Sequence, residues 1–125
     1  MKIEDAVEKI LSLDKEGKVK FIILYGSHAR GEARRDSDAD LCIYYEGTKR
    51  EAFEFRMKSL KGTPKDYEVQ IFNLLPLSLR KECSKDAVIF CRDWEFLRDI
   101  TYGIIKEFED FKRYCYDYIG LEAME

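Results

Sequence analysis

Two hydrophobic segments, residues 19–25 and 41–45, are joined by the polar stretch GSHARGEARRDSDAD, which begins with glycine and ends in an Asp-Ala-Asp motif. The first segment is almost continuously apolar, which is typical of a central strand buried on both faces. The glycine lets the backbone turn sharply and approach a ligand. The carboxylates at the mouth of the second strand can hold a divalent metal ion. Together these features indicate nucleotide chemistry.

The remaining pattern alternates helices with strands. Apolar residues at helical spacing predict a helix over residues 2–16, which Gly17 is placed to end. Thr48 can cap a second helix that ends at Gly62-Thr63-Pro64 and carries Ala52, Phe53, Met57 and Leu60 on one face. The other predicted elements are a short helix over 27–32, a strand over 67–72, a short helix over 76–83, a strand over 87–91 and a long helix from residue 93.

The long helix carries one regular stripe at steps of three and four residues. Its members are Trp94, Leu97, Thr101, Ile104, Phe108, Phe111, Cys115 and Tyr118. About 26 residues at ~1.5 Å each would span ~39 Å, which exceeds the width of a small domain. The stripe is either core alone or core that also forms a protein interface. A homo-oligomer through this helix is compatible with the second reading.

The predicted fold is therefore α/β (α+β), with a small mixed sheet of about four strands flanked by helices and a long C-terminal helix. We expect one domain over residues 1–125, with a core over about 1–92 and a C-terminal helical region over about 93–120. The net charge of −3 argues against a strong nucleic-acid footprint, which usually shows as a basic domain. No apolar run reaches the ~20 residues of a membrane span, and we expect a cytoplasmic protein. The cysteines have no CxxC spacing, so a zinc site has little to build on.

Gly26 and Ser27 are the candidate phosphate ligands. The Ser27 hydroxyl and free backbone N–H groups at a helix start can hold a phosphate oxygen. An ordinary turn with Ser27 as helix cap is the alternative interpretation. Neither a GxxxxGK[ST] nor a GxGxxG motif is present. Arg30 either contacts phosphate or ties the loop to a carboxylate.

Asp38 and Asp40 are the candidate metal ligands. On an extended segment their side chains share a face, with Cα atoms roughly 6.6 Å apart. A solvated turn capped by aspartates is the alternative, and Asp36 is expected to be structural or exposed. Glu68 is the candidate third carboxylate, because a neighbouring strand in register would bring it to the same metals. It would act as general base, and Gln70 on the same face would touch substrate. An ordinary exposed strand glutamate is the alternative interpretation of Glu68.

Taken together, these residues resemble the minimal nucleotidyltransferase family of the polymerase-beta-like superfamily. The stretch GSHARGEARRDSDADL is similar to the family's extended motif, GSxxRG followed by SDxDL. The segments NLLPLSLR, AVIFCRD and EFEDFKRY also resemble the family's C-terminal half. The third carboxylate of the family is usually an aspartate, and here that position is Glu68.

The resemblance implies a polymerase-beta-like fold and an Mg²⁺-dependent transfer of a nucleoside monophosphate, AMP from ATP, to a hydroxyl group. It implies two Mg²⁺ ions held by Asp38, Asp40 and Glu68, with Gly26 and Ser27 on the phosphates of ATP. It also implies an antitoxin that modifies a tyrosine of a partner toxin with a HEPN domain. Neutralisation by binding alone, and transfer to a small hydroxylated molecule with a separate substrate-binding subunit, are the alternatives.

Overall fold

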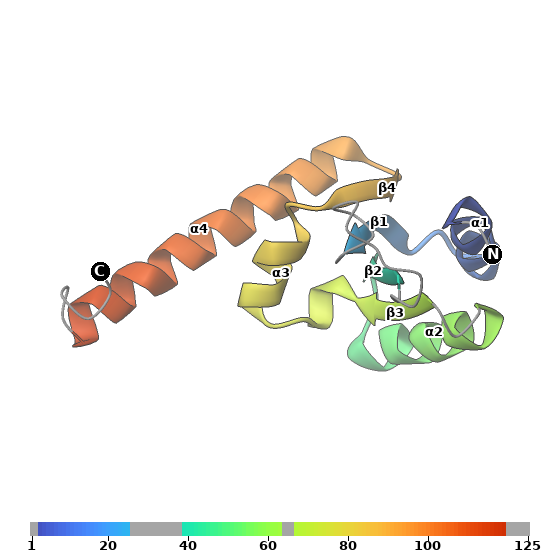
Figure 1. Cartoon of the computed structure of the whole chain (residues 1–125), viewed down its shortest axis with the longest axis horizontal. Helices are drawn as coiled ribbons and strands as arrows, with labels where there is room; N and C mark the ends of the chain where they lie inside the picture. The colour runs from blue at the N-terminus through green and yellow to red at the C-terminus, as the bar shows by residue number, and fades with distance from the viewer. Residues whose placement is uncertain (1–2, 26–38, 64–66, 120–125) are drawn as a thin grey trace.

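The computed structural model of the chain describes residues 3–25, 39–63 and 67–119 (Figure 1). The elements follow in the order α1 (Ile3–Leu13), β1 (Val19–Tyr25), β2 (Ala39–Tyr45), α2 (Lys49–Gly62), β3 (Tyr67–Ile71), the 3₁₀ turn η1 (Phe72–Leu74), α3 (Leu77–Cys83), β4 (Ala87–Cys91) and α4 (Trp94–Ile119). The predicted order of these elements is confirmed. The short helix predicted over residues 27–32 lies outside the described residues.

The strands form one four-stranded sheet in the order β3-β2-β1-β4. β1 pairs antiparallel with both β2 and β4, whereas β2 and β3 are parallel. The sheet is therefore mixed, and β1 lies inside it, as its nearly continuous apolar sequence predicts. β2 begins at Ala39, earlier than the predicted residue 41, so Asp40 belongs to the strand itself.

Helices cover both faces of the sheet. One core cluster joins α1 and α2 to one set of alternating strand residues: Ile22, Leu24, Leu41, Ile43, Val69 and Ile71. The other cluster joins α3 and α4 to the opposite set, which includes Phe21, Ile23 and Cys42. Because successive strand residues point to opposite faces, the parity of a residue decides which helices it meets. Asp40 has the parity of Cys42, so it belongs to the face that α3 and α4 cover.

The first helix is shorter than the predicted range of 2–16. It ends at Leu13 because the next residue, Asp14, turns its carboxylate to the backbone N–H groups of Lys18 and Val19, at 2.8 Å each. Gly17 takes the left-handed conformation, with φ of 68°, which a residue without a side chain adopts at little cost. The helix therefore ends through a side-chain contact, and Gly17 completes the turn into β1.

The predicted cap of α2 is confirmed, and of its predicted apolar face Ala52 and Leu60 pack on the core, whereas Phe53 and Met57 do not. The Thr48 hydroxyl accepts from the N–H of Glu51, and the Glu51 carboxylate accepts from the N–H of Thr48. The buried residues are Ala52, Phe55 and Ser59, while Phe53 and Met57 are 56% and 40% exposed. Phe55 lies between Ala52 and Ser59, and these small neighbours let the helix approach the sheet closely. Phe53 and Met57 lie outside this stripe.

The last helix has the predicted length of 26 residues, and Asp93 caps it by accepting from the N–H groups of Glu95 and Phe96. Its first half packs on the body, and its second half projects away from it (Figure 1). Leu97 and Ile104 are the buried members of the predicted stripe. Despite this length, no helix within the described ranges is apolar enough over a sufficient length to cross a membrane.

Candidate active site

Three polar side chains lie in one row where β1 ends and β2 and β3 begin. Asp40 is the direct Cα partner of Tyr25 on β1 and of Glu68 on β3. Neighbouring strands are about 4.8 Å apart, and paired residues point to the same face. The pairing thus places the Asp40 and Glu68 carboxylates side by side. The register that the hypothesis of Glu68 as third carboxylate requires is observed.

A cavity of about 290 Å³ opens above this row. Its polar rim consists of Tyr25, Asp40, Glu68 and Gln70. Its apolar wall is formed by Leu75 and by Leu79 of α3, and Cys42 and Cys83 line it as well. The cavity therefore has carboxylates on the side of the sheet and hydrocarbon on the side of α3.

The two cysteines meet beneath the cavity. The thiol groups of Cys42 and Cys83 are free and buried, with their sulfur atoms 2.9 Å apart in a hydrogen bond. This hydrogen bond, together with burial, raises the pKa of the Cys42 thiol. A thiol held in the protonated form is a poor nucleophile. Both thiols are buried, and buried free cysteines behave mainly as small apolar side chains, so the pair packs the floor of the site.

Gln70 touches Glu68 from the same strand. Its side-chain Nε2 donates to Oε1 of Glu68 at 3.0 Å. The two residues are two positions apart on β3 and share a face, and the Cα partner of Gln70 is Cys42. Within the rim, one carboxylate oxygen of Glu68 thus has a defined protein partner.

The chemistry of the rim fits a divalent metal ion. Carboxylate oxygens are the protein ligands that Mg²⁺ prefers, together with phosphate oxygens and water. Among the described residues no group of three or more His, Cys, Asp or Glu side chains could hold a metal. Asp40 and Glu68 would therefore hold it together with substrate phosphates, or with Asp38, which precedes β2 in the sequence.

Four of the predicted site residues, Gly26, Ser27, Arg30 and Asp38, lie outside the described residues. Of the predicted catalytic carboxylates, Asp40 and Glu68 are brought together. Sequence reasoning missed Tyr25 and the contribution of α3 to the cavity. The alternation of residues along β1 and β2 could have predicted that Tyr25 and Cys42 share a face with Asp40. Nothing in the sequence predicted that Leu79 lines the cavity.

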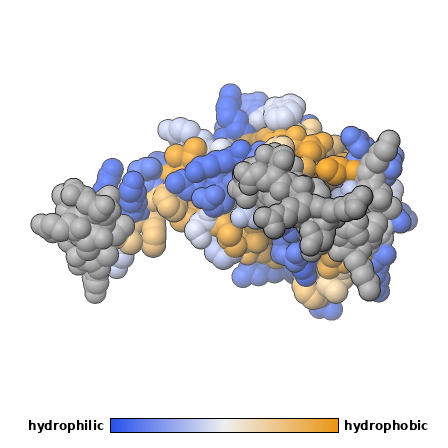
Figure 2. Space-filling view, viewed as in Figure 1, coloured by the Kyte–Doolittle hydropathy of each residue, from blue (hydrophilic) through white to orange (hydrophobic). Residues whose placement is uncertain are grey.

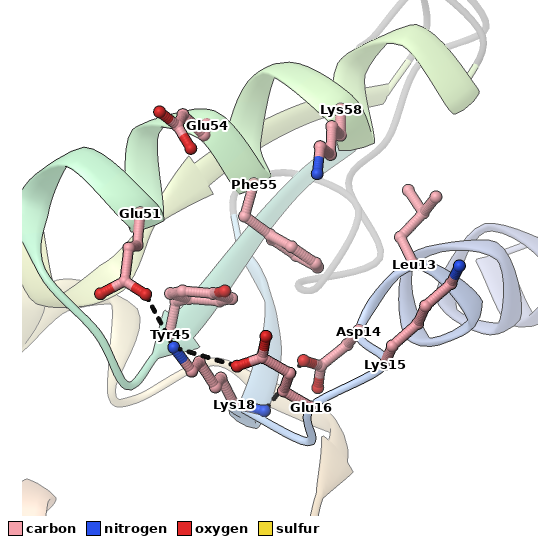
Figure 3. A pocket seen from close by; sticks show the side chains of 10 residues that line it. All are labelled: Leu13, Asp14, Lys15, Glu16, Lys18, Tyr45, Glu51, Glu54, Phe55 and Lys58. Carbon is pink, nitrogen blue, oxygen red and sulfur yellow. Dashed lines mark hydrogen bonds and ion pairs between the residues drawn. The ribbon is translucent and has the colours of Figure 1, made fainter.

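A larger hollow of about 510 Å³ lies at the other side of the sheet, between the end of α1 and α2 (Figure 3). The Lys18 ammonium projects between Glu16 and Glu51, at 3.2 and 2.7 Å. Its charge is already balanced by these two carboxylates, and Asp14 beside it is bound to the backbone. Lys18, Glu16, Glu51 and Asp14 in this hollow thus bind one another or the backbone.

Paired carboxylates at the mouth of a mixed sheet are compatible with metal-assisted phosphate chemistry. Residues 7–95 match the model of the family described as polymerase beta, nucleotidyltransferase. The chain belongs to this family and is a nucleotidyltransferase. The family resemblance predicted from the GSHARG and SDADL motifs is confirmed.

A relative with the name "Putative protein adenylyltransferase", from Methanocaldococcus jannaschii, is 30% identical over 96 residues, which cover 77% of this chain and 75% of the relative. A solved toxin-antitoxin structure with AMP-PNP superposes with a TM-score of 0.74 at 16% identity, covering 99% of this chain and 100% of the other. A solved complex of a tri-AMPylated HEPN toxin with an MNT antitoxin, from Shewanella oneidensis, gives 0.67 at 14% identity and covers 98% of both chains. At these identities the two structures establish the shared fold.

Proposed function

We propose that this protein transfers AMP from ATP to a tyrosine hydroxyl of a partner protein with a HEPN domain, and so acts as an antitoxin. The observation that carries the proposal is the direct pairing of Asp40 with Glu68 at the rim of a cavity. Support also comes from the adenylyltransferase name of the M. jannaschii relative. The HEPN toxin of the S. oneidensis complex, whose antitoxin has a related fold, is itself AMPylated.

The roles follow from the chemistry of each group. Asp40, Glu68 and Asp38 are proposed to hold the metal ions. Gly26 and Ser27 are proposed to bind the ATP phosphates through backbone N–H groups and the serine hydroxyl, and Arg30 to add a positive charge beside them. When bound, two Mg²⁺ ions would neutralise the phosphates and stabilise the attacking and leaving oxygens.

The transfer itself is a single displacement. Glu68 takes the proton of the acceptor hydroxyl as general base. The acceptor oxygen forms a bond to the α-phosphorus of ATP, the bond from this phosphorus to the bridging oxygen breaks, and pyrophosphate leaves. Asp40 lies beside Glu68 on the neighbouring strand. In this position it would help to hold ATP next to the acceptor hydroxyl. Positioning of this kind removes part of the entropic barrier of a two-substrate reaction.

The shape of the cavity supports an aromatic acceptor. A phenolic hydroxyl has to reach Glu68 while its ring leaves water. Leu75 and Leu79 supply hydrocarbon within the same cavity as the carboxylate. Leu79 is 41% exposed, so an incoming ring would cover apolar surface that is now open to solvent. A ring packed there gains the stabilisation of buried apolar area.

The projecting helix supports a protein partner. Trp94, Tyr102, Phe111 and Tyr114 of α4 are 65, 71, 54 and 62% exposed. Figure 2 shows hydrophobic and hydrophilic residues side by side along the projecting helix. Large exposed aromatic side chains gathered on one element are typical of protein interfaces. An acceptor that belongs to a docked protein requires no further substrate domain within this chain.

The test is transfer of label from α-³²P-ATP to a purified HEPN-domain partner in the presence of Mg²⁺. We expect label on the partner with the wild type, and a loss of at least about a hundredfold in rate with Asp40→Asn or Glu68→Gln, as for other removed transition-state contacts. Glu54→Gln is the matched control, because Glu54 is an exposed carboxylate that pairs with Arg50 at 3.3 Å and lines the other hollow. Label that persists unchanged in Asp40→Asn would refute the proposal.

Neutralisation by binding alone is the second candidate, and the exposed aromatic residues of α4 favour it equally. The two functions separate in one experiment. If Asp40→Asn still neutralises its partner and still forms the complex, binding is sufficient. If the variant binds its partner but no longer neutralises it, adenylylation is required.

A further inference from the structure

Gln70 is a polar residue of the rim for which the sequence predicts contact with substrate but no part in holding the carboxylates. It is half-buried, lines the cavity with Asp40 and Glu68, and donates to Glu68 Oε1 at 3.0 Å. Its backbone is fixed by the pairing of β3 with β2, where it lies opposite Cys42 on the floor. The two residues thus share a strand that the sheet holds in place, and the Gln70 side chain is half-buried whereas the Glu68 side chain is exposed.

We propose that Gln70 is a positioning residue that sets the orientation of the Glu68 carboxylate. This inference rests on the proposed function, because it concerns the same carboxylate. A glutamate side chain has several rotatable bonds, so the exposed carboxylate of Glu68 has many orientations to lose. A hydrogen bond to Oε1 restricts these orientations and leaves Oε2 as the oxygen to meet a metal ion or the acceptor proton. Preorganised side chains of this kind gain from a fixed second partner.

The Gln70 amide is uncharged, and this matters for the metal site as much as its hydrogen bond to Glu68 does. A lysine at this position would also donate to Glu68, but its positive charge would oppose a metal ion a few ångströms away. A second glutamate would repel Glu68 by the same argument. Glutamine donates a hydrogen bond and leaves the net charge of the rim unchanged, so it can orient the carboxylate without competing for it.

The test substitutes Gln70→Met, which keeps the length of the side chain and removes the donor. Affinities for Mg²⁺ and Ca²⁺ are measured by calorimetry in the presence of α,β-methylene-ATP, whose α–β linkage resists transfer. We expect Mg²⁺ affinity to fall about tenfold, the equivalent of about 1.4 kcal/mol for a lost bond to a charged group. Ca²⁺ affinity should fall less, because Ca²⁺ accepts flexible geometry while Mg²⁺ demands near-ideal octahedral ligands.

Asn73→Leu is the matched control for loss of an amide. The Asn73 side chain accepts from the N–H of Tyr45 and donates to its C=O, at 3.2 and 2.9 Å, away from the cavity. We expect Asn73→Leu to lower the melting temperature and leave the metal affinity unchanged. We expect Gln70→Met to lower the Mg²⁺ affinity and leave the melting temperature unchanged. Gln70→Met with wild-type affinity for Mg²⁺, or with equal losses for Mg²⁺ and Ca²⁺, would overturn the proposal.

A second measurement uses the unaltered glutamine. The ¹⁵N–¹H signals of the Gln70 side-chain amide should shift in Glu68→Ala, because the acceptor is gone. Unchanged signals would overturn the inference even if Gln70→Met folded poorly. Neither measurement involves the acceptor protein. If Asp40→Asn still transfers AMP, the proposed function is refuted. If Asp40→Asn is inactive but Gln70→Met keeps the wild-type Mg²⁺ affinity, only the inference about Gln70 is refuted.

Discussion

Asp14 joins the end of α1 to the start of β1, and Asp14→Ala tests how much this junction stabilises the fold. Its carboxylate accepts from the N–H groups of Lys18 and Val19, at 2.8 Å each, and the residue is 9% exposed. A hydrogen bond to a charged group contributes about 1.5 kcal/mol at the low end, so the two bonds amount to about 3 kcal/mol. The ion pair with Arg92 at 3.5 Å adds little, because the Arg92 side chain is half exposed.

We therefore expect Asp14→Ala to lose about 3 kcal/mol in urea denaturation followed by circular dichroism. At about 4 °C per kcal/mol for a domain of this size, the melting temperature should fall by roughly 12 °C. Asp14→Asn keeps one acceptor oxygen and should lose about half as much. Glu16→Ala removes a carboxylate that is 74% exposed and should change stability by less than about 0.5 kcal/mol. If the alanine variants at positions 14 and 16 differ by less than about 1 kcal/mol, the reasoning is wrong.

Three further predictions concern separate parts of the molecule. The hydrogen bond from Lys18 lowers the pKa of Glu51 to about 2 from its usual 4.5. The stabilisation of the fold by the ionised Glu51 is therefore present above pH 4.5 and lost toward pH 2. Glu51→Gln should flatten the plot of melting temperature against pH between pH 5 and 2. A Cβ at Gly103 would meet nothing within 4 Å, and Gly103→Ala should stabilise the helix by about 0.5–1 kcal/mol, seen as a higher urea midpoint. Alkylation of Cys42 and Cys83, mapped by mass spectrometry, should proceed only as fast as the chain opens, and rapid labelling of the native protein would contradict their burial.

The sheet could be predicted largely because its elements alternate. A helix between two strands is the usual connection of parallel neighbours, and α2 joins β2 to β3 in this manner. The spacing of two residues between Glu68 and Gln70 then fixes that both lie on one face. What the sequence could not decide is the register. A shift by one residue would have sent Glu68 to the opposite face, and the observed pairing with Asp40 follows from the packing of both strands.

In α2 and α4, apolar character and burial do not coincide. In α2 the aromatic Phe53 is exposed, and Ser59 is fully buried in its place. In α4 the periodic stripe continues through Phe111, but the body beneath it ends earlier, so that this ring is 54% exposed. Periodicity gives the direction in which a side chain points along the helix. It does not give the length over which another element lies underneath.

The two sides of the cavity are built by different elements: the carboxylate side by β2 and β3, and the apolar side in part by α3. Asp40 and Glu68 are placed by strand parity and pairing, which fixes the backbone position of both residues. Leu79 is placed by α3, a helix of 7 residues that reaches the site only after the chain has left β3 through η1. On the proposed function, transfer of AMP depends on the first side and recognition of the acceptor on the second. Substitutions in α3 can therefore change which hydroxyl is accepted while the carboxylate pair, and with it the chemistry, stays in place.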